Sequence, residues 1–148
     1  YRYTFDHHDT QDILQEGFSR VFAGLENYQA EKGKLLAWVR KIHINCALDF
    51  LKKKKQIVDE QHGIEALPDD RTIAYEKHEA EYILQFIEEL DPRDRVIFNM
   101  HHIEGYSHQE IAEMLSINVN SSRVYLARAR KLLRDRISDF QTKLSVAQ

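Results

Sequence analysis

The sequence predicts an all-α protein built from two small helical domains. Helix breakers are scarce, with 2 Pro and 5 Gly among 148 residues, and residues that favour helices dominate. Apolar residues also recur at helical spacing in several separate segments. The length suits one ordinary domain or two small ones. We expect domains at residues 1–55 and 74–148, with an acidic linker at 56–73 between them.

The charges are unevenly distributed along the chain, although the formal net charge is only −3. Residues 1–56 carry ten Lys/Arg and seven Asp/Glu, whereas residues 57–94 carry three and twelve. Residues 95–148 carry eight and five, and their basic residues are concentrated in 123–136. An acidic middle thus separates two mildly basic ends, and the total charge conceals a local basic surface.

The first half of the chain predicts two helices separated by a polar loop. The first spans residues 9–27, with Thr10 as its N-cap. A loop at 28–34 follows, and the second helix spans residues 35–55 and ends in four lysines. The first helix is expected to turn inward a stripe made of Leu14, Phe18, Val21, Phe22 and Leu25. The apolar side of the second holds Leu35, Trp38, Val39, Ile42, Cys46 and Leu51.

The helical pattern stops from residue 56 to about residue 72, where Gly63, Pro68 and two adjacent aspartates occur. It resumes in a helix at 74–90, which is expected to bury Ile83, Phe86, Ile87 and Leu90. Asp91 and Pro92 mark the start of a further helix that runs to about residue 102, because Asp caps helices and Pro is tolerated in the first turn.

Residues 107–140 predict a helix-turn-helix. Ser107 and Glu110 match a capping box, a short turn occupies 116–118, and a basic helix runs from about 119 to 140. Its residues Leu126, Ala129 and Leu133 share one face and are expected to pack. The opposite face carries cations around a small residue, which allows close approach to a DNA groove. This pattern favours DNA binding over a solvated amphipathic helix.

Four segments resemble, in the right order, segments of the extracytoplasmic-function sigma factors of bacterial RNA polymerase. They are DILQEGFSRVF at 12–22, KGKLLAWV at 32–39 with the residues up to Asp49, LDPRDR at 90–95 with EGYS and EIA at 104–112, and ARARKLL at 127–133. The resemblance implies an N-terminal domain that binds the polymerase clamp and reads and melts the −10 element. It implies a C-terminal domain that reads the −35 element and touches the polymerase flap. In the family the first domain begins with a further helix or two.

The resemblance also implies site residues. Asn45 matches a residue that helps to hold a flipped −10 base, and its amide offers both a donor and an acceptor. The 28–34 loop resembles the loop that selects this base. We expect −10 contacts from Lys34, Arg40, Lys41 and Asn45, and polymerase contacts from Asp12, Gln15, Glu16 and Arg20. We expect −35 contacts from Ser121, Arg123, Val124, Ala127, Arg128 and Lys131.

Residues 120–126 read NSSRVYL where the family often has GTVKSRL, so promoter specificity does not transfer from relatives. The expected partners are core RNA polymerase, promoter DNA and an anti-sigma factor, and the protein is expected in the cytoplasm. The two domains are expected to form a compact inhibited state in which they clamp a partner or each other. A single cysteine, Cys46, excludes an internal disulfide and fits a reducing compartment.

We expect no enzymatic activity, cofactor or metal site. Adjacent pairs such as His101 and His102 do not face one another on a helix, and Cys46 lacks partners at a ligand spacing. Three alternatives share part of the pattern. They are a helix-turn-helix regulator that is not a sigma factor, a metal-dependent helical enzyme, and an interaction protein that binds polymerase or a regulator without DNA.

Overall fold

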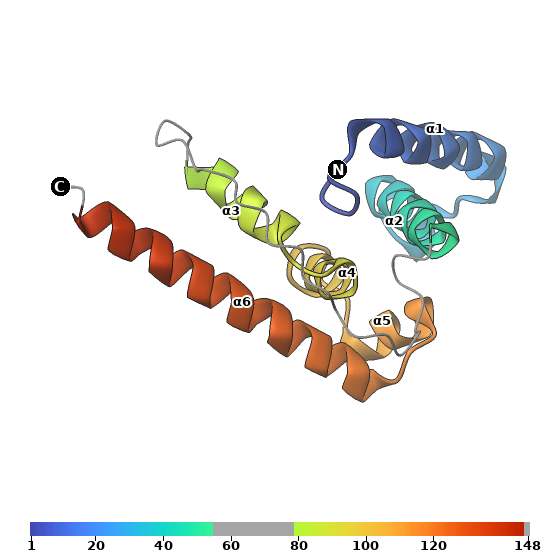
Figure 1. Ribbon diagram of the computed structural model, residues 1–148. Coiled ribbons are helices and arrows are strands. Elements are labelled where there is room, and N and C mark those ends of the chain that lie inside the picture. The colour runs from blue at the N-terminus through green and yellow to red at the C-terminus, as the bar shows by residue number, and fades with distance from the viewer. Residues whose placement is uncertain (55–78, 147–148) are drawn as a thin grey trace.

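The computed structural model describes residues 1–54 and 79–146, and every regular element in those two ranges is a helix. This confirms the expected fold class. The linker expected at 56–73 lies outside the described residues. Within these ranges, none of the helices combines the length and apolar character that crossing a bilayer requires. The longer helices are α1 (His7–Gly24), α2 (Leu35–Lys53), α3 (Glu79–Glu88), α4 (Pro92–Phe98), α5 (His108–Leu115) and α6 (Val119–Val146) (Figure 1).

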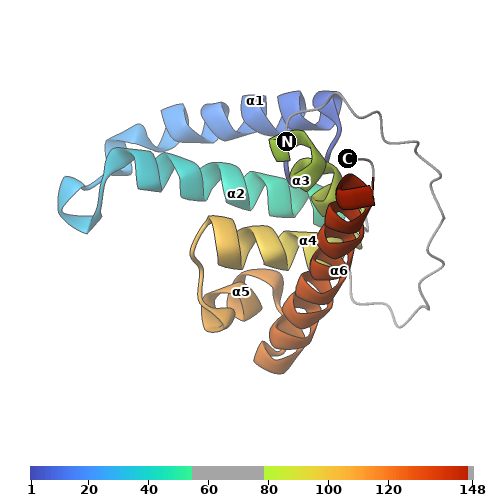
Figure 2. The same ribbon diagram turned by 90° about the vertical axis from the view of Figure 1, so that its left-hand side faces the viewer.

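Three short turns complete the described helical structure. The 3-10 turns η1 (Leu25–Asn27) and η2 (Ala30–Lys32) lead from α1 to α2, and the π turn η3 (Asn99–Ile103) continues α4. Both ribbon views place α2 between α1 and α4 (Figures 1 and 2). In Figure 2, α5 lies beyond α4 and α6 runs across the end of this stack. The N-terminal helix pair therefore rests on the C-terminal helices.

The start of α1 differs from the expected start at Thr10. The Asp6 carboxylate accepts a hydrogen bond from the Asp9 backbone N–H at 2.8 Å, so Asp6 is the N-cap. The Thr10 hydroxyl instead donates to the Asp6 carbonyl oxygen at 2.6 Å, inside the first turn. The helix consequently begins at His7, before the apolar periodicity that located it in the sequence.

A glycine lets α1 and α2 pack closely. The buried line of α1 is Ile13, Gly17 and Val21, residues spaced four apart. A Cβ atom at Gly17 would lie 2.4 Å from the His43 ring on α2. The His43 Nδ1 atom is 2.9 Å from the Val39 carbonyl oxygen, and this hydrogen bond fixes the ring where the glycine meets it.

This packing makes the expected inward stripe of α1 wrong at four of its five positions. Val21 is buried, but Leu14, Phe18, Phe22 and Leu25 are exposed, with Phe22 72% exposed. The helix contacts α2 through the line that contains Gly17. The larger apolar side chains lie on other sides of α1 and are therefore exposed. Leu35, which was expected on the apolar side of α2, is also exposed.

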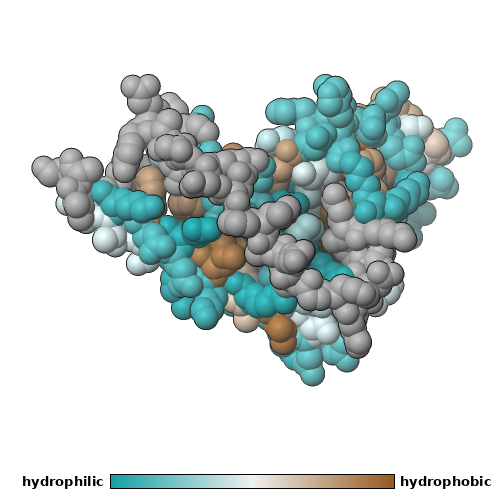
Figure 3. Space-filling model, viewed as in Figure 1, coloured by the Kyte–Doolittle hydropathy of each residue, from teal (hydrophilic) through white to brown (hydrophobic). Residues whose placement is uncertain are grey.

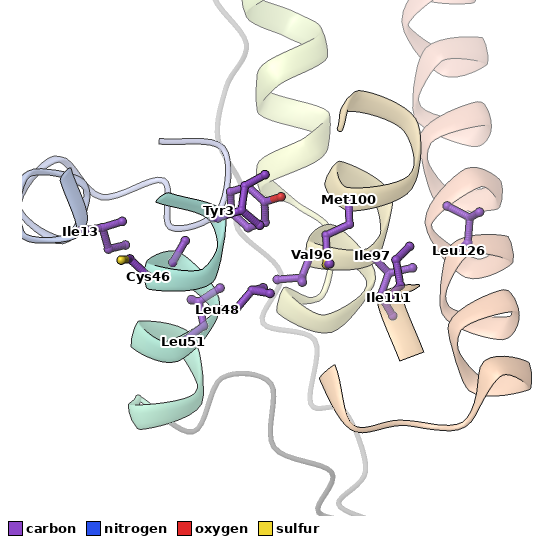
Figure 4. Packing of buried hydrophobic residues seen from close by; sticks show 12 residues of the cluster. Tyr3, Ile13, Cys46, Leu48, Leu51, Val96, Ile97, Met100, Ile111 and Leu126 are labelled. Carbon is purple, nitrogen blue, oxygen red and sulfur yellow. The ribbon is translucent and has the colours of Figure 1, made fainter. Parts of the chain in front are cut away.

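The main hydrophobic core joins the two halves of the molecule. Leu48 and Leu51 of α2 pack with Val96, Ile97 and Met100 of α4 and η3, and all five are at most 2% exposed. In Figure 4, Leu48 points toward Val96, and Tyr3 lies between the residues of α2 and those of α4 and η3. On the face shown in Figure 3, hydrophilic residues cover most of the described surface around smaller hydrophobic patches. Helix α2 also contributes Ile44, Cys46 and Ala47 to this cluster. The other buried residues of the cluster are Tyr3, Ile13, Ile111 and Leu126.

A second cluster fixes α3 against α6. Tyr82, Phe86, Ile87 and Leu90 are buried with Ala129 and Leu133, and Phe140 packs on them. Ile83 was expected to face inward but is 52% exposed, because Tyr82 takes the place on the packed face. The expected burial of Phe86, Ile87 and Leu90 is confirmed, as is that of Leu126, Ala129 and Leu133. Helix α6 runs to Val146, beyond its expected end at 140.

We expect Gly17→Ala to lower the free energy of unfolding by about 1–3 kcal/mol, because the added methyl group must displace a ring held by its own hydrogen bond. Urea denaturation followed by circular dichroism measures this change. Gly24→Ala is the matched control, since its Cβ would lie 3.5 Å from Trp38, an ordinary contact distance. Equal stabilities for the two variants would contradict the proposed close approach.

Candidate nucleic-acid interface

Helices α5 and α6 form the helix-turn-helix that the sequence predicted. The Ser107 backbone N–H donates to the Glu110 carboxylate at 2.8 Å, and the Glu110 N–H donates to the Ser107 hydroxyl at 3.3 Å. This confirms the capping box. Ser116 ends α5 in the left-handed conformation, with a φ of 56°. The His108 Nδ1 atom lies 2.9 Å from the hydroxyl of Ser122, which is fully buried and ties α6 to the start of α5.

One side of α6 holds the helix in the domain and leaves another side exposed. Ser122, Leu126, Ala129 and Leu133 are buried, at the spacing of one helical face. Ser121 is partly buried at the edge of that face. The Arg123 guanidinium donates to the Asn120 side chain at 3.0 Å, a local contact on the exposed side. The expected site residues that this side brings together are Arg123, Val124, Ala127 and Lys131, all of them exposed.

Arg128 is exposed as well, but unlike the residues of this row it is paired with a side chain of another helix. Its guanidinium donates two hydrogen bonds to the Asp94 carboxylate of α4, at 2.9 and 2.8 Å, and lies over the Tyr125 ring. Burial raises the pKa of the Asp94 carboxyl, and the two hydrogen bonds from Arg128 act against that effect. The expected −35 contact of Arg128 stays a prediction, and the structure adds that its guanidinium links α6 to α4.

Three histidines lie beside the helix-turn-helix. The rings of His101 and His108 are stacked with centroids 4.6 Å apart, and Arg130 donates to His102 at 2.9 Å. Burial lowers the pKa of both His102 and His108, and neighbouring Arg130 acts in the same direction. Nowhere in residues 1–54 and 79–146 do three or more His, Cys, Asp or Glu side chains gather in a way that could hold a metal ion.

On α2, an aromatic residue lies between polar candidates for DNA contact. Trp38, Lys41 and Asn45 are spaced by three and four residues, so they share one side of the helix, and Lys34 precedes them as its N-cap. Trp38 and Asn45 are partly buried, and the two lysines are exposed. Trp38 packs near Tyr28, whose hydroxyl donates to the Gly33 carbonyl oxygen at 2.9 Å and braces the 28–34 loop. We call these four residues the α2 stripe.

Arg40 lies apart from the α2 stripe. Its Nε atom is 3.7 Å from a carboxylate oxygen of Glu104, which belongs to the turn before α5. The Glu104 side chain is only 7% exposed and also pairs with Arg2 at 3.4 Å. Arg40 therefore faces the C-terminal half of the molecule. The sequence alone does not reveal Glu104 as a partner of Arg40, which is why Arg40 was expected beside Lys41.

The expected polymerase-binding residues lie on α1 and are all exposed. Arg20 donates to Glu16 at 2.7 Å and to Asp49 of α2 at 3.0 Å, so two of these residues are joined to the helix pair. Asp12 and Gln15 lie at the N-terminal end of the same surface, flanked by the exposed Leu14. The structure leaves all four side chains exposed on α1, and their contact with polymerase stays a prediction.

Sequence reasoning missed the apolar character of this surface. Leu14, Phe18 and Phe22 are exposed along α1, and Leu36 at the start of α2 is 72% exposed. A signal was present, because α1 carries more large apolar residues than contact with one neighbouring helix can bury. It also missed Asn99 and Glu104, polar residues whose partners lie about a hundred residues away in the sequence.

Comparison with known proteins identifies the family. Residues 1–57 match the family model for sigma-70 region 2, and residues 80–133 match that for sigma-70 region 4. Sigma factor SigV of Bacillus subtilis is 30% identical over 90% of this chain and 79% of its own length. The chain belongs to the extracytoplasmic-function group of RNA polymerase sigma factors. Region 2 thus comprises α1 and α2, and region 4 includes the helix-turn-helix of this sigma factor.

Two further relatives agree with this assignment. The sigma factor SigW of Bacillus subtilis is 27% identical over 94% of this chain and 81% of its own length. The sigma factor SigE of Mycolicibacterium smegmatis is 30% identical over 91% of this chain. The chain spans only 54% of the length of that SigE relative.

We expect Arg128→Ala to lower the free energy of unfolding by about 1–3 kcal/mol, because it leaves the buried Asp94 carboxylate without its two hydrogen bonds. The pKa of Asp94, followed by NMR titration, should rise further, since the groups that oppose the effect of burial are removed. Arg134→Ala, at an exposed position on the same helix, is the control. An Asp94 titration that is the same in both variants would refute the structural role of Arg128.

Proposed function

We propose that this sigma factor binds core RNA polymerase and directs it to promoters, reading the −35 element with α6 and the −10 element with α2. The observation that carries the proposal is the exposed row of Arg123, Val124, Ala127 and Lys131 on a helix whose other side is buried. A helix presented in this way by a helix-turn-helix enters the major groove. The family assignment supports the same conclusion.

Within the row, the side chains differ in what they can read. Arg123 offers the planar fork that pairs with guanine, and Lys131 acts as a point charge on the phosphate backbone. Ser121 lies near the helix start, where a hydroxyl and backbone N–H groups suit a phosphate. Arg128 acts indirectly in this scheme, because its bonds to Asp94 set the position of α6.

The α2 stripe suits unpaired promoter bases. Aromatic rings stack on bases of any sequence, and flanking cations follow the backbone of a single strand. Trp38 packs near Tyr28 of the 28–34 loop, with Lys34 at the N-cap before it and Lys41 one turn after it. Asn45 ends the stripe with an amide that can pair with the edge of a flipped base.

The proposed partners are core polymerase, promoter DNA and an anti-sigma factor, and the proposed site of action is the cytoplasm, where polymerase works. In this scheme the protein supplies recognition, and polymerase supplies the catalysis. A helix-turn-helix regulator that is not a sigma factor is not favoured, because residues 1–57 match sigma-70 region 2. Run-off transcription with purified core polymerase tests the proposal. Promoter-specific transcripts support it, and their absence across promoters that related sigma factors use overturns it.

We expect Asp12→Ala combined with Gln15→Ala to weaken binding to core polymerase about tenfold or more, since two exposed polar contacts of an interface would be lost. Fluorescence anisotropy with labelled protein measures the affinity. Asp139→Ala combined with Gln141→Ala, exposed positions near the end of α6, is the control. Unchanged affinity in the α1 variant, with its circular dichroism intact, would place the polymerase contact elsewhere.

For the −35 element, we expect Arg123→Ala to cost about 1–3 kcal/mol of affinity and to reduce the preference for matched over scrambled duplexes. Lys131→Ala should weaken all duplexes about equally and reduce the salt slope by about one. Titrations at several salt concentrations separate the two effects. If Arg123→Ala leaves the matched-to-scrambled ratio unchanged, α6 only positions the domain on DNA.

A further inference from the structure

The histidines beside the helix-turn-helix lie along the side of α6 that carries its proposed DNA-reading residues. Arg130 donates from Nε to the Nε2 atom of His102 at 2.9 Å. Arg130 follows Arg123 by seven residues, which is about two helical turns, so both arginines lie on one line of α6. Both are exposed, as is His102. A duplex that lies along the exposed row therefore also passes close to His102.

The hydrogen bond between Arg130 and His102 exists only while the imidazole ring is neutral. An arginine donates and never accepts, so the Nε2 atom of His102 carries a lone pair and no proton. A proton at this atom would replace the lone pair with a second donor beside the guanidinium. The contact would then become repulsive, and both groups would be left with an N–H that needs an acceptor.

A second pair of rings is also sensitive to charge. The His101 Nδ1 atom is 2.9 Å from the Tyr106 carbonyl oxygen and therefore carries a proton, because a carbonyl only accepts. The ring of His108 stacks on that of His101 with centroids 4.6 Å apart, and its Nδ1 atom contacts the Ser122 hydroxyl. Two stacked rings repel each other when both are charged. The pair therefore takes up protons more readily when an anion is close.

Among the described residues, the charged neighbours that shift the pKa of these rings are all basic. Burial is the main cause that lowers the pKa of His102, followed by Arg130 of α6 and His101 of η3. The pKa of His108 is lowered by burial, then by His101, Arg123 and Arg130. Donors gathered in this way leave a place for an anion, and the anion that a helix-turn-helix meets is a phosphate of the DNA backbone.

We propose that DNA binding by the helix-turn-helix is coupled to proton uptake by a histidine cluster, which comprises His101, His102 and His108. A backbone phosphate accepts hydrogen bonds from Arg130 and from protonated His102, and it replaces the hydrogen bond between these two side chains. The proton comes from solvent and binds at the Nε2 atom of His102. This inference rests on the proposed function, because it assumes that α6 lies against the −35 element.

The direction of the pH effect follows from the charges. Burial and basic neighbours hold the pKa of His102 and of His108 low in the free protein. A phosphate favours the charged rings and so raises these pKa values in the complex. Protons are therefore taken up on binding wherever the pH lies between the free and the bound pKa. The affinity for DNA rises as the pH falls through this range, and it is level below it.

Fluorescence anisotropy with a labelled −35 duplex, at constant ionic strength from about pH 6 to about pH 8, tests the coupling in the full chain. We expect the affinity to fall about tenfold as the pH rises over this range, the size of effect that one coupled ionisation produces. A scrambled duplex should show the same fall, because a phosphate carries no sequence information. In His102→Gln combined with His108→Gln, the fall should shrink to about twofold or less.

The matched control is His7→Gln combined with His8→Gln, which removes two exposed histidines from α1 and should keep the full fall. Circular dichroism checks that both double variants are folded. Equal falls in the two double variants overturn the inference. NMR titration of the unaltered chain needs no variant, and the inference is also overturned if His102 and His108 have the same pKa with and without the duplex. A pKa that rises with inorganic phosphate but not with the duplex has the same consequence.

The same measurements separate this inference from the proposed function. If the matched duplex is preferred over the scrambled one but the affinity does not change with pH, α6 reads the −35 element and the proton coupling is refuted. If the affinity depends on pH only while His102 and His108 are present, but no duplex is preferred, the coupling stands and the reading of the −35 element by α6 fails. An absence of binding to either duplex at every pH overturns both.

Discussion

Burial of α2 on two sides is the constraint on which the rest of the structure depends. One side meets α1 at the contact between Gly17 and His43, and another meets α4 through Leu48 and Leu51. A helix enclosed in this way has only its flanks left for polar chemistry, and the α2 stripe occupies one of them. The same enclosure brings the acidic turn at Glu104 against Arg40. The position of the candidate −10 residues follows from how α2 is packed.

In the C-terminal half, one set of α6 residues positions the helix and another set is exposed for recognition. Its buried face is apolar except for Ser122, which His108 satisfies with a hydrogen bond. Its flank is fixed by the pair of Arg128 and Asp94, which spans two helices with a bidentate geometry. Because these contacts orient the helix, the exposed row keeps one direction although none of the contacts that set the helix's position comes from the row itself. Presentation and recognition are thus performed by different residues of one helix.

Local sequence signals predicted most of the fold and less of the site. Helical spacing and start signals such as Asp91 and Pro92 located the longer helices, and the capping box at Ser107 and Glu110 was correct, because caps and periodicity are properties of neighbouring residues. Thr10 failed as a cap because Asp6 lay outside the apolar pattern that was used to find the helix. The α1 stripe failed because the missing side chain of Gly17, and not the size of Phe18 or Phe22, determined which line of the helix met α2.

Long-range partners explain the remaining differences. Arg128 and Arg40 look equivalent to Arg123 in the sequence, but Asp94 and Glu104 are tens of residues distant along the chain and only folding brings them into contact. The role of each half was predicted from the resemblance to the sigma factor family, because helical periodicity gives no information about function. It could not say which arginines are engaged within the protein itself.

Cys46 illustrates a final consequence of the way α2 is enclosed. The side chain is 3% exposed, and burial raises the pKa of its thiol, although Arg20 acts in the opposite direction. The thiolate is the form that reacts with peroxides and disulfides, so this sulfur is both shielded and in its less nucleophilic state. It is also the only cysteine among these 148 residues. The thiol of Cys46 is therefore poorly placed to react directly with an oxidant.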